Sequence, residues 1–156
     1  MNKTDVLTEL LDLLKAEFEG AVSASQDAAE YATNEEARAE SQWDTQGIEA
    51  SYLAAGQATQ ARQWAQAIET LEQYRNDLLE PKDAVALGAL VTCDINGSRD
   101  RFFVAPAAGG QILTLNGDEI TVVTPQSPMA TRILGKRENE TFTLANGVPG
   151  SVLKVQ

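Results

Sequence analysis

Apolar residues in the first half of the chain recur at intervals that suit one face of an α-helix. The first series is Leu7, Leu11, Leu14, Phe18, Ala21, Ala28 and Ala32, and the second is Leu53, Ala61, Trp64, Ile68, Leu71 and Leu78. Their spacings of threes, fours and sevens are typical of coiled coils. The pattern predicts two long amphipathic helices before Pro81.

The two series also predict how the helices pair. In helices that fold back on each other, facing positions share a constant sum of residue numbers, and positions 7 and 78, 14 and 71, 21 and 64, and 32 and 53 all give 85. We therefore predict an antiparallel coiled-coil hairpin that turns near residue 42 or 43, within residues 40–47. The capping-box pattern of residues 33–36 leaves a second interpretation open, in which a new helix begins at Asn34.

The second half of the chain alternates apolar and polar residues in short runs, which is typical of strands. These runs are 85–95, 101–105, 111–115, 120–124, 140–145 and 151–155, and they are separated by Gly109-Gly110 and by Asn-Gly pairs at 96–97, 116–117 and 146–147. Asn-Gly favours tight hairpin turns because both turn residues need a positive φ. We expect a small antiparallel β-sheet here, which makes the whole chain α+β.

Residues 127–134 interrupt this alternation and predict one short helix. Ser127 is placed as its N-cap, Pro128 occupies the first helical position, and Gly135 follows the last turn. All five prolines lie at or beyond Pro81. Because proline interrupts helices, we divide the chain into a hairpin domain, 1–80, and an α+β domain, 81–156.

The charge is as unevenly distributed as the prolines. The net charge of the 156-residue chain is -11, and residues 1–80 carry 16 acidic and 5 basic side chains, whereas 81–156 carry 7 of each. The acidic residues become denser towards the expected turn, so the hairpin should have an acidic tip near 40–49. A chain this acidic is not expected to bind the DNA backbone or to recognise a DNA sequence directly.

Composition excludes several classes of site. The chain has no histidine and one cysteine, which rules out histidine-based triads, imidazole metal sites, internal disulfides and paired-cysteine zinc sites. No run of about 18 apolar residues is present, and the first twenty residues are acidic, unlike a signal peptide. We expect a cytoplasmic protein with no membrane span.

Residues 120–136, Ile-Thr-Val-Val-Thr-Pro-Gln-Ser-Pro-Met-Ala-Thr-Arg-Ile-Leu-Gly-Lys, resemble the C-terminal signature of the bacterial Gre family of transcript cleavage factors. In that signature a strand leads to Ser-Pro, an apolar residue and Ala, followed by a short helix and a Gly-Lys pair. Residues 87–92 and 151–155 are similar to the first and last strands of the same domain. The resemblance is specific in residues 85–156 and extends to the rest of the chain through the helical hairpin.

The resemblance implies an FKBP-like C-terminal domain that binds RNA polymerase beside its secondary channel. Ser127, Pro128 and Met129 are then the expected docking residues, with Arg132 beside them. The hairpin would enter the channel, so the protein would be a transcription elongation regulator and a monomer. It would not be an enzyme itself, because the polymerase hydrolyses backtracked RNA, and it would need no cofactor of its own.

In the Gre family, carboxylates at the hairpin tip help to hold Mg²⁺ in the polymerase active centre. The matching candidates are Asp44, Glu40 and Glu49, with Asp44 and Glu40 as metal ligands and Trp43 as a partner contact. Oxygen ligands of this kind suit Mg²⁺. Asp44 also fits a purely structural role as the N-cap of the second helix.

The tip departs from the family pattern, which has Asp and Glu three residues apart. The Glu position falls on Gly47, or on Ile48 when Tyr52 is aligned instead. Two variants therefore stay open, a stimulator of RNA cleavage and a modulator that occupies the channel without stimulating cleavage. A third hypothesis is a coiled-coil adaptor unrelated to polymerase. The FKBP-like fold also suggests prolyl isomerase activity, but the domain's only aromatic residues are Phe102, Phe103 and Phe142, too few for the expected pocket.

Overall fold

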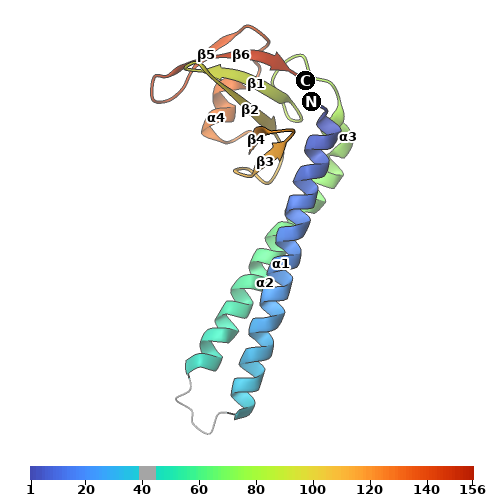
Figure 1. Ribbon diagram of the computed structural model, residues 1–156, viewed down its shortest axis with the longest axis vertical. Coiled ribbons are helices and arrows are strands. Elements are labelled where there is room, and N and C mark those ends of the chain that lie inside the picture. Colours follow the sequence, from blue (N-terminus) through green and yellow to red (C-terminus); the bar gives the residue numbers. More distant parts are fainter. Residues whose placement is uncertain (39–44) are drawn as a thin grey trace. The chain divides into compact units, whose positions relative to one another are not determined.

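Two long helices precede a β-sheet in a computed structural model (Figure 1). The structure describes the backbone of residues 1–38 and 45–156 and the side chains of residues 1–33 and 48–156. The helices are α1 (Lys3–Arg38), α2 (Thr45–Gln73), α3 (Arg75–Leu79) and α4 (Pro128–Ile133). The strands are β1 (Leu90–Ile95), β2 (Ser98–Val104), β3 (Ile112–Leu115), β4 (Asp118–Val123), β5 (Thr141–Thr143) and β6 (Pro149–Val155). The predicted α+β class and helical hairpin are confirmed.

The chain divides into two compact units. The hairpin unit is Asp12–Ile68, and the sheet unit combines Met1–Leu11 with Glu69–Gln156. The first turns of α1, the end of α2 and the whole of α3 therefore belong to the same unit as the sheet. The division into domains at residue 80 stays a prediction. Among the described helices, none combines the length and apolar character needed to cross a membrane.

α1 continues through the segment where the capping-box pattern left a break open. The hydroxyl of Thr33 donates to the carbonyl of Ala29, 2.9 Å away and one turn earlier in the same helix. A threonine side chain that bonds back in this way lies inside a helix rather than capping a new one. The interpretation in which a new helix begins at Asn34 is therefore wrong.

Most of the predicted seam is buried, but its register differs near the end of the hairpin. Ala28 and Ala32 are buried, whereas Leu53 is 54% exposed and Ala50, one turn earlier in α2, takes the buried position. The Ser25 hydroxyl donates to the Ala54 carbonyl across the two helices at 3.2 Å. Ala is small enough to bring the backbones close, which Leu at the same position would prevent.

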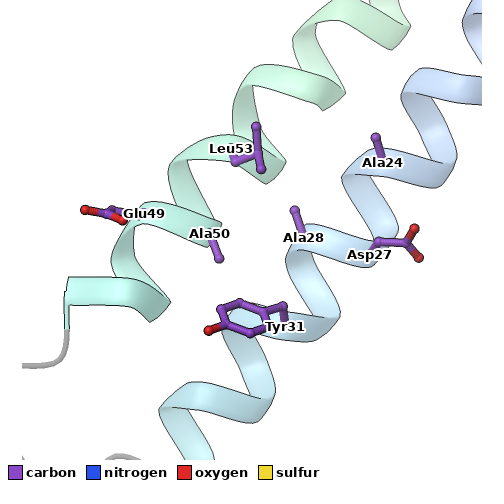
Figure 2. A pocket seen from close by; sticks show the side chains of 7 residues that line it. All are labelled: Ala24, Asp27, Ala28, Tyr31, Glu49, Ala50 and Leu53. Atoms are coloured by element: carbon purple, nitrogen blue, oxygen red, sulfur yellow. The ribbon is translucent and has the colours of Figure 1, made fainter.

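The neighbours of Leu53 on α1 therefore lie about one helical turn away from the predicted partner. Leu53 lies beside Ala24 and Ala28 (Figure 2), whereas the constant sum paired it with Ala32. The turn at residue 42 or 43 falls outside the described residues. α1 ends at Arg38 and α2 begins at Thr45, so residues 45–47, expected in the turn segment, belong to α2.

The six strands form one sheet in the order β3-β4-β2-β1-β6-β5. Each strand overlaps one predicted run, but β1 begins only at Leu90, and β2, β4 and β6 begin two or three residues earlier than predicted. The sheet is mixed rather than wholly antiparallel, because β2 and β4 run parallel, with Phe103 opposite Val122. β3 and β4 form an antiparallel hairpin, and it is β4, the second strand of that hairpin, that lies next to β2.

Two of the three Asn-Gly turns are as predicted, and the third differs, because at 146–147 only Gly147 has a positive φ, of 83°. Asn96 and Gly97 have φ values of 53° and 84°, and Asn116 and Gly117 have 53° and 83°. Each pair closes a two-residue hairpin, between β1 and β2 and between β3 and β4. Positive φ at both positions gives the turn a twist that matches the strands, so these local signals fix the strand register.

The sheet buries side chains on both faces. One face packs with α4 in a core of Val85, Ala89, Val91, Cys93, Val104, Val123, Ala130, Ile133, Phe142, Val152 and Val155. Leu90, Phe103, Leu113, Ile120 and Val122 point to the opposite face and are at most 2% exposed. Burial on the second face is partial, because Arg99 and Lys154 lie on that face and are exposed.

Lys3 joins the start of α1 to the segment that leads into the sheet. Its ammonium group donates to the carbonyls of Glu80 and Gly88, the latter at 2.9 Å, and the residue is only 8% exposed. Burial and, to a smaller extent, the charge of nearby Lys82 lower the pKa of Lys3 to about 8, against an opposing effect of Glu80. A buried lysine therefore holds together parts of the sheet unit that are far apart in sequence.

Candidate functional site

The start of α4 is built as the sequence predicted. The hydroxyl of Ser127 accepts a hydrogen bond from the backbone N–H of Ala130 at 3.1 Å, and Pro128 occupies the first turn. This bond satisfies one of the N–H groups that a helix leaves unpaired at its beginning. The N–H of Ser127 donates to the carbonyl of Thr124, the residue that follows β4, at 2.9 Å.

The other end of α4 is fixed equally firmly. Gly135 has a φ of 80°, a left-handed conformation that ends the helix with little steric cost in glycine. Its N–H donates to the Val85 carbonyl at 2.7 Å, and the Val85 N–H donates to the Lys136 carbonyl at 2.8 Å. α4 is thus a rigid element, anchored at both ends to the segments around it.

An open hollow of about 540 Å³ lies between α4 and the end of β4. Its lining residues are Gly109, Gly110, Thr121, Val122, Val123, Thr124, Ser127, Pro128 and Met129. Pro128 is exposed and Met129 partly exposed. Three of the four docking residues that the resemblance implied, Ser127, Pro128 and Met129, therefore meet at one surface.

Sequence reasoning missed the other wall of this hollow. The Gly109-Gly110 turn, predicted only as a turn, lies against the end of β4, and a Cβ atom at Gly109 would come within 3.0 Å of the Thr124 side chain. Ile112, 56% exposed, stands opposite Thr121 on the same face. No local signal reveals this proximity, because the turn and α4 are about twenty residues apart in the chain.

Arg132 is exposed on the last turn of α4. It is not among the residues that line the hollow. Arg132 is therefore not part of the surface that Ser127, Pro128 and Met129 form.

The tip residues are only partly described. Glu40, Trp43 and Asp44 lie outside the described residues, and Glu49 is exposed near the start of α2. In Figure 2 the carboxylate of Glu49 points away from α1, and that of Asp27 points away from α2. The described residues contain no cluster of three or more side chains that could hold a metal ion.

A second hollow, of about 710 Å³, lies between α1 and α2 (Figure 2). Its lining residues are Ala24, Asp27, Ala28, Tyr31, Glu49, Ala50 and Leu53. The alanines form a shallow floor, while Tyr31 and Leu53 are 46% and 54% exposed beside it.

Comparison with known proteins gives similarity to solved structures. No protein-family model matches the chain, and no curated protein matches it. The chain is similar to a crystal structure of GreA factor homolog 1 (Gfh1) of Thermus thermophilus, at 16% identity over 94% of both chains, with a TM-score of 0.36.

Two further structures of the same kind are similar to the chain. Gfh1 of Thermus aquaticus shares 17% identity over 93% of this chain and 92% of its own, with a TM-score of 0.37. A structure described as the transcription factor Gfh1 shares 17% identity over 94% and 92%, with a TM-score of 0.40.

Proposed function

We propose that this chain is a transcription elongation regulator that acts in the cytoplasm on RNA polymerase. The hollow at the start of α4 docks on the polymerase, and the acidic end of the hairpin enters the secondary channel. The chain performs no chemistry by itself. In the variant that stimulates cleavage, its tip carboxylates act on a Mg²⁺ ion held by the polymerase.

The observation that carries this proposal is the arrangement of Ser127, Pro128 and Met129. These residues provide the sequence resemblance to Gre factors, and they line one hollow with two of them open to solvent. The cap of α4 uses the Ser127 side chain internally, which leaves Pro128 and Met129 to form the contact. Pro128 is exposed, whereas Met129 packs partly against the core and keeps part of its surface open. An apolar contact that is already ordered in this way binds a partner at low entropic cost.

Co-purification with core RNA polymerase tests the docking surface. We expect the native chain to associate at moderate salt and Met129→Glu to lose association, since a carboxylate would be buried in an apolar contact. Tyr74→Glu is the matched control, because Tyr74 is 41% exposed and does not line the hollow. Failure of the native chain to associate would reject the proposal.

A transcript-cleavage assay on stalled complexes separates the two variants of this function. If the chain stimulates cleavage, Asp44→Asn and Glu49→Gln should each lower the rate, while Glu30→Gln, an exposed residue of α1, should not. If the chain only occupies the channel, the native protein itself should produce no cleavage. The glycine at position 47, where the family pattern has Glu, favours the second variant.

The hollow between α1 and α2 supports a second candidate, a coiled-coil adaptor. In that case the side of the hairpin carries the binding surface, through Tyr31 and Leu53. Leu53→Glu would then abolish partner binding and Met129→Glu would leave it intact. The two candidate functions are thus distinguished by opposite effects of the same pair of substitutions.

A further inference from the structure

A row of three side chains, two of them cationic, crosses the adjacent strands β2, β1 and β6. Thr92 on β1 stands directly between Arg101 on β2 and Lys154 on β6. Directly paired residues share a face, and adjacent strands are about 4.8 Å apart, so Arg101 and Lys154 are roughly 10 Å apart along the sheet. Arg99 lies on the same face, two residues before Arg101.

These residues surround a hollow of about 270 Å³, lined by Thr92, Arg99, Arg101, Leu153 and Lys154. Leu153 is 38% exposed. It is the extra residue of a bulge, because β6 pairs Lys154 with Thr92 but Val152 with Cys93. Bulges re-aim side chains in this way next to functional sites.

The acidic neighbours of the row are already engaged. Asp118 forms an ion pair with Arg101 at 2.8 Å, and the Arg101 side chain is only 22% exposed. Asp94 stands directly opposite Arg99 across β1 and β2 and accepts a hydrogen bond from the N–H of Gly97 at 2.9 Å. Glu138 accepts a hydrogen bond from the N–H of Val155, the residue after Lys154, at 3.1 Å. Among the described residues, no ion pair to Arg99 or Lys154 is present within 4.0 Å. The hollow is therefore lined by three cations, one hydroxyl and one leucine, with no carboxylate.

We propose that this row is a docking site for an acidic peptide segment of a partner protein, in which carboxylates contact Arg99, Arg101 and Lys154 and an apolar side chain packs on Leu153. The site is separate from the hollow at α4 and does not depend on the identity of the partner that binds there. In a chain of net charge -11, this local cationic surface gives a partner's carboxylates a defined place to bind.

Two observations favour a peptide over a nucleic acid. The net charge of the chain repels a long polyanion more strongly than a short peptide with a few carboxylates. No aromatic side chain on which a base could stack lines the hollow. A half-exposed leucine among the cations suits a side chain from a folded or extended peptide better than a phosphate group.

The test is an NMR titration of the full-length chain, labelled with ¹⁵N. The probe is a short peptide in which aspartate and glutamate flank a single leucine, and the same peptide with serine in place of leucine is its control. We expect saturable shifts at Thr92, Arg101, Leu153 and Lys154, with tighter binding of the leucine peptide. Arg99→Gln combined with Lys154→Gln should weaken binding at least about tenfold.

A matched double variant controls for general electrostatics. Lys15→Gln with Arg62→Gln removes the same charge from exposed positions of the hairpin unit and should change the affinity by less than about twofold. Equal weakening by both double variants, or shifts that do not saturate, would overturn the proposal. Tighter binding of a single-stranded RNA oligomer at the same surface and salt would overturn it in favour of a nucleic-acid site.

Discussion

Gly88 shows how a single residue sets the packing between α3 and the segment before β1. Its φ is 86°, and a Cβ atom there would come within 2.9 Å of the Asp77 carbonyl oxygen and of the Leu78 Cα. Both neighbours are backbone atoms, which cannot rotate away as a side chain can. Gly88 is thus required twice, for its conformation and for its lack of a side chain.

We expect Gly88→Ala to lower the free energy of unfolding by roughly 3 kcal/mol or more, because left-handed strain of about 1–2 kcal/mol adds to a backbone clash. Gly97→Ala is the matched control, since Gly97 has a φ of 84° but no atom within 4 Å of the added Cβ. It should show only the strain component. Urea denaturation of the two variants measures both values, and equal losses would contradict the clash.

Cys93 is the single cysteine of the chain and lies buried in the core beside α4. Burial and, to a smaller extent, the charge of Asp100 raise the pKa of its thiol to about 12. Because the thiolate is the reactive form, we expect almost no reaction with a disulfide reagent at pH 8 in the folded protein. Reaction should become rapid in denaturant, and rapid reaction without denaturant would show that this core opens readily.

At the scale of elements, the short helix α4 depends on its cap. Ser127→Ala removes the hydrogen bond to the Ala130 N–H and should cost about 1 kcal/mol of unfolding free energy. Thr131→Ala is the control, since the exposed Thr131 hydroxyl bonds only to the Pro128 carbonyl of the same turn. Denaturant titration compares them, and an equal loss in both would argue against the cap.

The elements also show what the sequence could predict. The Asn-Gly turns at 96–97 and 116–117 and the Ser127 cap depend on residues close together in the chain, so local chemistry was sufficient to predict them. The parallel contact of β2 and β4 depends on which strand of a hairpin reaches a distant neighbour, and no local pattern encodes that choice. The helix register failed at Leu53, because a constant sum ignores how closely small residues such as Ala50 let two helices approach.

In the candidate site, too, the residues that are neighbours in the sequence could be predicted and those brought together by strand pairing could not. Ser127, Pro128 and Met129 are consecutive, so a motif could identify them together. Gly109 and Ile112 complete the same surface, but they arrive there through the pairing of β3 with β4. Partner contacts assembled by sheet pairing are therefore the part of a site that a single sequence predicts least well.

At the scale of the whole chain, Lys3 joins segments separated by 77 and 85 residues. Nearby, the Gln156 side chain donates to the Met1 carbonyl at 3.3 Å, so the two ends of the chain meet in the sheet unit. No carboxylate forms an ion pair with Lys3 among the described residues. The buried ammonium is consequently stabilised only by carbonyl dipoles and by the opposing charge of Glu80.

This arrangement predicts an unusual pH dependence. The folded-state pKa of Lys3 is about 8, below its ordinary value of 10.5, so between these values the unfolded chain binds a proton that the folded chain has released. Stability therefore rises with pH across this window. We expect the unfolding free energy of the native chain, measured relative to Lys3→Met, to increase from about pH 8 to pH 10.5.

The comparison with Lys3→Met cancels the titration of other groups, Cys93 included, because both proteins share them. Lys82→Gln provides a second test, since it removes a charge that lowers the Lys3 pKa. The rise in stability should then begin at a higher pH than in the native chain. A difference between the native chain and Lys3→Met that stays constant from pH 7 to 11 would show that Lys3 keeps an ordinary pKa and is not desolvated by the fold.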